Sequence, residues 1–185
     1  MEIKIVQKKW NLILNRYDIY IDDVLEYKSQ TKLFNLKETI DIYSLGERKV
    51  ISVKKDNDFS NLMNYTLEFQ NGYTKIRSKS FIEFSIKNSK GSLNFYEQKS
   101  GNLIGVFQND DQVGFIKREI KKVINQDKYK IVFDKNKVDS LSLIGFAIAY
   151  DMENHNDSSF GNTWDYGMQV DKPIKEVDIN WSPEK

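Results

Sequence analysis

Most of the chain alternates apolar and polar residues with a period of two, which is the pattern of half-buried β-strands. Tyr65, Leu67 and Phe69, for example, fall on one face, with polar residues between them. Asn71-Gly72 predicts a type I′ hairpin, because both residues tolerate a positive φ. The pattern predicts twelve strands, over residues 3–8, 11–21, 24–31, 38–44, 48–55, 64–70, 73–79, 81–87, 92–97, 103–109, 112–119 and 128–134. Short strands with short connections favour an antiparallel meander that closes into a sandwich or a barrel.

Residues 141–150, L-S-L-I-G-F-A-I-A-Y, carry no charge and contain both alanines of the chain. A transmembrane helix needs roughly 20 apolar residues, so this segment is too short to span a bilayer. A buried strand and a buried helix both fit the run, and periodicity alone does not separate them. A helix that is apolar all round must be surrounded all round, which in a protein made of strands requires a closed sheet. The helix interpretation therefore predicts a barrel around a central helix, with Asp139 or Ser140 as its N-cap.

The order of these elements resembles a known family. The segments that carry the resemblance are Y-D-I-Y-I-D-D at 17–23, K-L-F-N-L-K-E-T-I-D-I-Y at 32–43, V-I-S-V-K-K at 50–55, and Y-K-I-V-F-D followed by the L-S-L-I-G-F-A-I-A-Y-D run. The chain resembles the tubby C-terminal-like fold, in its LURP-one-related and phospholipid-scramblase-like branch, over about residues 3–152. The resemblance implies a twelve-stranded antiparallel barrel around a central hydrophobic helix.

The domain organisation follows from these elements. We expect residues 1–152 to form the barrel, with the central helix at 140–151, and residues 153–185 to form a polar C-terminal appendage. Within this appendage the alternating residues 176–181 predict a short edge strand. The N-terminus lacks the apolar core of a signal peptide, which favours a cytoplasmic protein.

Composition limits the chemistry that the chain can carry. The formal charge is +1, so no overall field draws the protein to nucleic acid or membranes. The absence of cysteine excludes disulfides, thiolate metal sites and cysteine nucleophiles. The single histidine, His155, lies in a polar run and is expected in a solvated loop. Asp22-Asp23 and Asp110-Asp111 are expected in solvated turns, because no EF-hand spacing surrounds them.

No glycine-rich phosphate loop and no nucleophile elbow is present in the sequence. We therefore expect no cofactor, no metal and no catalysis. The alternative is an enzyme of unknown reaction that uses polar residues at the barrel mouth.

Basic residues form the candidate binding site. Lys75, Arg77 and Lys79 share one face of a strand, the outer face if Ile76 points inward. A second basic group contains Lys117, Arg118, Lys121 and Lys122. An ordinary solvated surface is the simpler interpretation of both. Tubby proteins are similar in placing a lysine and an arginine two apart on a strand to hold phosphoinositide headgroups, and K-I-R at 75–77 matches that pattern. The sequence thus predicts a non-catalytic binding module for anionic phospholipid headgroups or for a protein partner.

Overall fold

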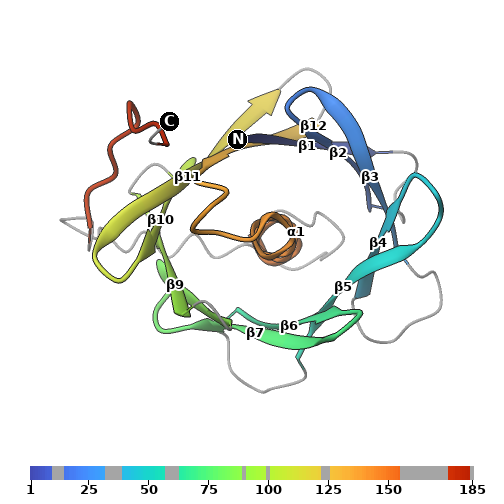
Figure 1. Cartoon of the computed structure of the whole chain (residues 1–185), viewed down its shortest axis with the longest axis horizontal. Helices are drawn as coiled ribbons and strands as arrows, with labels where there is room; N and C mark the ends of the chain where they lie inside the picture. The colour runs from blue at the N-terminus through green and yellow to red at the C-terminus, as the bar shows by residue number, and fades with distance from the viewer. Residues whose placement is uncertain are drawn as a thin grey trace.

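The computed structural model describes residues 1–9, 15–31, 39–56, 63–88, 91–98, 101–121, 126–154 and 175–183. These residues form twelve strands and one helix: β1 (Glu2–Lys9), β2 (Asn15–Ile21), β3 (Val24–Thr31), β4 (Thr39–Ser44), β5 (Lys49–Lys55), β6 (Asn64–Phe69), β7 (Gly72–Ser78), β8 (Glu83–Asn88), β9 (Gly91–Glu97), β10 (Leu103–Gln108), β11 (Asp111–Lys121), β12 (Gln126–Phe133) and α1 (Ser140–Asn154). Every strand pairs antiparallel with its neighbours in sequence, and β1 pairs with β12, so the sheet closes into a barrel. Figure 1 shows the ring of strands with α1 inside it. The predicted fold is confirmed.

The period-two pattern places one face of every strand inside the barrel. Tyr65 and Leu67 on β6 are fully buried, whereas Thr66 and Glu68 between them are partly exposed. The predicted strand boundaries are close to the observed ones. One difference is that β8 begins at Glu83 rather than at residue 81, because residues 79–82 form the turn that leads into it.

The helix α1 fills the inside of the barrel. Its apolar residues are buried on all sides, including Leu143, Ile144 and Phe146, each of them fully inaccessible to solvent. Asp139 is the N-cap, since its Oδ2 accepts hydrogen bonds from the Ser142 N–H at 2.9 Å and the Ser142 hydroxyl at 3.0 Å. Among the described residues, no helix is long and apolar enough to cross a membrane.

The two sides of α1 meet the wall differently. Gly145 faces β5 and β6, where an added Cβ would lie 2.9 Å from both methyl carbons of Leu67. On the other side, the Phe146 ring stacks on Phe95 of β9, with ring centroids 3.7 Å apart, and meets Phe84 of β8 edge-on. A glycine against one wall and an aromatic residue against the other let the helix fit inside the barrel.

The hairpin predicted around Asn71-Gly72 does form, but two loop residues with a positive φ, as a type I′ turn requires, occur instead in the hairpin between β2 and β3. Phe69 pairs with Gly72, so the loop residues are Gln70 and Asn71, and the positive φ belongs to Gly72 at 146°. Asp22 and Asp23, between β2 and β3, both have a positive φ, of 45° and 69°. Aspartate tolerates a positive φ better than most residues do. This backbone requirement explains why two aspartates occur here, and no bound metal ion is needed to explain them.

The predicted edge strand at 176–181 is wrong. The described residues 175–183 contain no strand and lie outside the ring beside β10 and β11, as the red segment of Figure 1 shows. The physical reason is the closure of the barrel. Each strand already pairs on both sides, so the sheet offers no free edge to an added strand.

Candidate functional site

The outer wall of β7 carries the predicted basic row. Ile76 is fully buried inside the barrel, so Lys75 and Arg77 project outward, and Lys79 follows in the turn. Their side chains are 45%, 43% and 50% exposed, respectively. Lys75 and Arg77 therefore share the outer face of β7 as expected, whereas Lys79 is exposed just beyond the end of the strand.

Each cation of the row lies near a carboxylate. Asp56, which follows β5, has its Oδ2 at 3.1 Å from Arg77 Nη1 and 3.8 Å from Lys75 Nζ. Glu83 lies 2.9 Å from Lys79 Nζ, and this hydrogen bond raises the pKa of Lys79. Three cations against two carboxylates leave one net positive charge. The row is therefore much less positive than its sequence indicates.

The turn that follows the row presents an exposed aromatic side chain. Phe81 is 60% exposed at the tip of residues 79–82. The turn is well hydrogen-bonded, since the N–H groups of Lys79 and Ser80 donate to the Glu83 carbonyl at 2.8 and 3.3 Å. The Ser78 hydroxyl also donates to the Ser80 carbonyl at 2.7 Å. Phe81 was not singled out from the sequence, although a phenylalanine inside the polar turn S-K-S-F was a visible signal.

The second basic group does not form one site. Lys117 is exposed on the outer wall of β11. Arg118, its neighbour, faces inward, because it pairs across the sheet with Tyr129, whose hydroxyl reaches the helix. Lys121 ends β11, and Lys122 lies outside the described residues. Lys117 is also four strands away from the β7 row, or ~19 Å at 4.8 Å per strand, so the two groups are separate.

Inside the barrel, at the C-terminal end of α1, a buried carboxylate is surrounded by hydrogen-bond donors. Asp151 is 1% exposed and accepts hydrogen bonds from Tyr17, from Tyr129 at 2.6 Å and from the Gln7 amide at 3.2 Å. Burial raises the pKa of Tyr17 well above its usual value, and the Asp151 charge adds to this effect. Tyr17 therefore stays protonated, and its hydroxyl stabilises the Asp151 carboxylate. Sequence reasoning missed this cluster, because its members are far apart along the chain.

A second polar group lies beside it. The pKa of Glu97, at the end of β9, is raised chiefly by burial. The hydrogen bond from Tyr150 and the charge of Arg118 lower this pKa, but by less. The pKa of Tyr150 is also raised, first by burial and then by the Glu97 charge. Glu97, Tyr150 and Arg118 thus interact with one another. The enzyme alternative named no residues, so this group does not test it.

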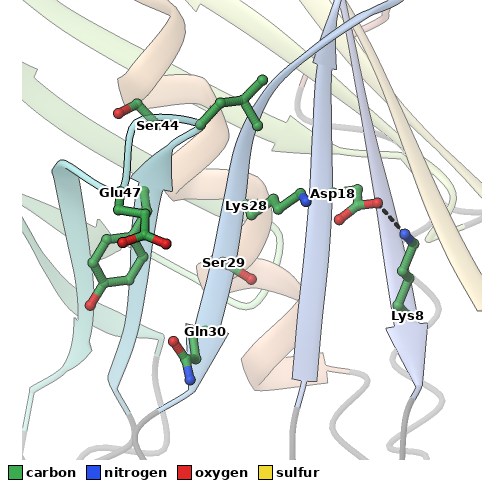
Figure 2. Close-up of a pocket in the computed structure, with 9 residues that line it drawn as sticks. Lys8, Asp18, Lys28, Ser29, Gln30, Ser44 and Glu47 are labelled. Atoms are coloured by element: carbon green, nitrogen blue, oxygen red, sulfur yellow. Dashed lines mark ion pairs between the residues drawn. The ribbon is translucent and has the colours of Figure 1, made fainter.

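The outer wall of β1–β4 contains a hollow of about 740 Å³. Figure 2 shows Asp18 between Lys28 and Lys8, and Lys8 forms an ion pair with it. Glu47 lines the opposite side of this hollow. Two lysines and two carboxylates balance in charge, so the hollow has no electrostatic preference for an anion.

Within the described part of the chain, no group of three or more His, Asp or Glu side chains is placed to hold a metal ion. His155 lies outside this part. Comparison with protein-family models, with curated proteins and with solved structures finds no significant match to this chain. The resemblance to tubby-like proteins therefore stays a prediction, and the function is argued from the geometry of the described residues.

Proposed function

We propose that this protein is a non-catalytic binding module that attaches weakly and reversibly to anionic lipid surfaces through the outer wall over β7 and β8. The observation that carries the proposal is the exposed Phe81, held in a hydrogen-bonded turn directly after the row of Lys75, Arg77 and Lys79. An aromatic side chain beside basic residues suits the interface between lipid headgroups and acyl chains. The site of action would be the cytoplasmic face of a membrane, where anionic lipids are concentrated.

The expected attachment is weak. One net positive charge contributes ~1 kcal/mol near an anionic surface. Burying the Phe81 side chain at the interface adds ~2 kcal/mol, taken from the transfer of an exposed phenylalanine to an apolar environment. A total of ~3 kcal/mol corresponds to a dissociation constant in the millimolar range. Stable attachment would require a second contact, such as a membrane-bound partner.

The lipid headgroup has two competitors, an enzymatic function and a protein partner. The K-I-R match to the tubby-like pattern supports a headgroup ligand. The enzyme alternative has less support, because Asp151 is 1% exposed and three side-chain donors already occupy its carboxylate oxygens. A protein partner is the second candidate, favoured by contacts on a different wall of the barrel that are described below.

The test is co-sedimentation of the full chain with lipid vesicles. We expect binding to vesicles that contain phosphatidylserine, no binding to phosphatidylcholine vesicles, and loss of binding as salt rises. Replacing Lys75, Arg77 and Lys79 together by glutamine should abolish binding, and Phe81→Ser should weaken it. Both variants should melt close to the wild type, because surface ion pairs and exposed side chains contribute little to folding.

Matched controls lie away from the row and from Phe81. Lys117→Glu changes the same kind of charge on β11, four strands away, and Tyr73→Ser removes an aromatic side chain that is 71% exposed at the other end of β7 from Phe81. Neither control should alter vesicle binding. A wild-type chain that ignores anionic vesicles at low salt would show that the lipid proposal is wrong. Equal effects of the controls would show that the contact is not at β7–β8.

A further inference from the structure

The outer face of β10 and β11 carries an apolar patch. Phe107 and Phe115 are 3% and 8% exposed, yet neither belongs to the core cluster inside the barrel. Phe115 pairs directly with Gly105 across the two strands, so both lie on the outer face. Outward aromatic residues of a barrel are normally in contact with water. Another part of the protein must therefore cover this patch.

The cover includes the segment of residues 175–181, which we call the strap. Its Lys175 ammonium lies 4.5 Å from the centre of the Phe107 ring and 2.9 Å from Asp110 Oδ1. This contact lowers the pKa of Asp110. Val177 packs directly on Gly105, where an added Cβ would overlap Val177 Cγ2 and lie 2.7 Å from Phe107 Cε2. A glycine is therefore required for the strap to approach the strand.

Two glutamine side chains hold the main chain of the strap. Gln98 Nε2 donates to the Lys175 carbonyl at 2.9 Å. Gln112 makes a pair of hydrogen bonds with Asp178: its Nε2 donates to the Asp178 carbonyl at 2.9 Å, and its Oε1 accepts from the Asp178 N–H at 3.0 Å. Bonds to the main chain recognise an extended chain of almost any sequence. Selectivity therefore rests on the two positions that face the barrel, Lys175 and Val177.

The contacts that attach the strap to the barrel are made by Lys175, Val177 and Asp178. The strap does not join the sheet, and Ile179, in its second half, is 61% exposed. Glu176 is also exposed, so its side chain takes no part in the contact with the barrel. Residues 155–174 connect the strap to α1, so the strap competes with any external ligand as part of the same chain. A tethered segment of this kind acts at an effective concentration of roughly millimolar.

We propose that the groove between Gln98 and Gln112, over Gly105 and Phe107, is a docking site for an extended segment of another protein, and that the strap occupies it until such a segment displaces it. The partner segment carries a lysine two residues before a β-branched residue, which fits Phe107, Asp110 and Gly105 as the strap does. The residue after the β-branched one is not proline, because its N–H donates to Gln112. This site lies on a different wall from β7–β8, so the proposal stands or falls independently of lipid binding.

The test uses a labelled peptide with the strap sequence K-E-V-D-I-N-W and fluorescence anisotropy on the full chain. The variant with both Lys175→Glu and Val177→Asp weakens the strap and opens the groove. We expect it to bind the peptide at least tenfold more tightly than the wild type does, because the wild-type strap competes. Glu176→Lys is the matched control, and it should bind the peptide as the wild type does.

Removing a charge tests the position of the peptide. Asp110→Asn, added to the double variant, should weaken binding of this peptide, because the peptide lysine loses its carboxylate partner. If the double variant unfolds, Lys175→Glu alone provides the same comparison with a smaller expected gain. The proposal is overturned if weakening the strap does not improve peptide binding, or if Asp110→Asn has no effect. It is also overturned if the wild type is a dimer that Val177→Asp dissociates, because the groove would then bind a second copy of the chain.

Discussion

Gly145 brings the central helix close to the wall formed by β5 and β6, and Gly145→Val tests that contact. A Cβ there would lie 2.9 Å from both Leu67 methyl carbons and 3.0 Å from Ile51 Cδ1. Carbon atoms pack best at about 3.5–4.0 Å, so these side chains must move by ~0.5–1 Å. Leu67 and Ile51 are buried and have little room to do so.

The expected cost follows from two opposing effects. Overpacking a well-filled core costs ~1–3 kcal/mol. Replacing glycine within a helix recovers only a few tenths of a kcal/mol when the new residue is β-branched, since valine is itself a weak helix former. The free energy of unfolding should therefore fall by ~1–3 kcal/mol, and the melting temperature by ~2–12 °C at 2–4 °C per kcal/mol. Gly145→Ala should be close to neutral, because its gain of ~1 kcal/mol in helix propensity offsets a smaller overlap.

The assay is thermal and urea unfolding followed by circular dichroism. Gly46→Val is the control, since Gly46 is exposed and an added Cβ would meet only Ser44 Oγ, at 4.0 Å. Combining Gly145→Val with Leu67→Ala tests the cause directly. If the two side chains collide, the double variant will be more stable than the sum of the single changes predicts, by ~0.5–3 kcal/mol. A wild-type melting temperature for Gly145→Val, or strict additivity, would refute the close packing of the helix.

Two further predictions concern the polar groups around the C-terminal end of α1. Burial raises the pKa of Glu97 in the folded state, so folding loses stability as the pH rises from the usual glutamate pKa through the raised one. Glu97→Gln should remove this loss, and its advantage in melting temperature over the wild type should grow as the pH rises above the usual glutamate pKa. Tyr129→Phe removes one of the hydrogen-bond donors to the buried Asp151 and should cost ~1–3 kcal/mol in urea unfolding. An unchanged midpoint would show that Asp151 does not depend on this donor.

The fold was predictable because its signals are local. Alternation along each strand identifies the inward face, as Tyr65 and Leu67 show. A short run without charge, such as residues 141–150, is stable only if it is surrounded, and a closed sheet satisfies that requirement. Alternation also predicts that Lys117 and Arg118 point to opposite sides of the wall. The prediction of one basic group containing Lys117 and Arg118 used their charge and not this alternation.

The parts that could not be predicted depend on contacts between distant segments. Asp56 neutralises part of the basic row from a different strand connection, and no local pattern links it to Arg77. The strap likewise alternates as a strand does, but the closed barrel leaves no edge for it, so side chains such as Gln112 bind its main chain instead. The sequence shows which residues are charged or apolar. It does not show which charges neutralise one another or which distant segments come into contact.

The role of Asp56 offers the most direct test of the proposed function. Asp56→Asn removes one of the two carboxylates beside the row, so the net charge there rises from one to two. At ~1 kcal/mol per charge, the affinity for vesicles containing phosphatidylserine should increase about fivefold, with no gain for neutral vesicles or at high salt. Glu2→Gln is the control, because it removes a carboxylate paired with Lys130 at 2.9 Å on β1, six strands away from β7. A fivefold gain for Asp56→Asn alone supports binding at β7–β8, whereas an unchanged affinity or an equal gain for Glu2→Gln contradicts it.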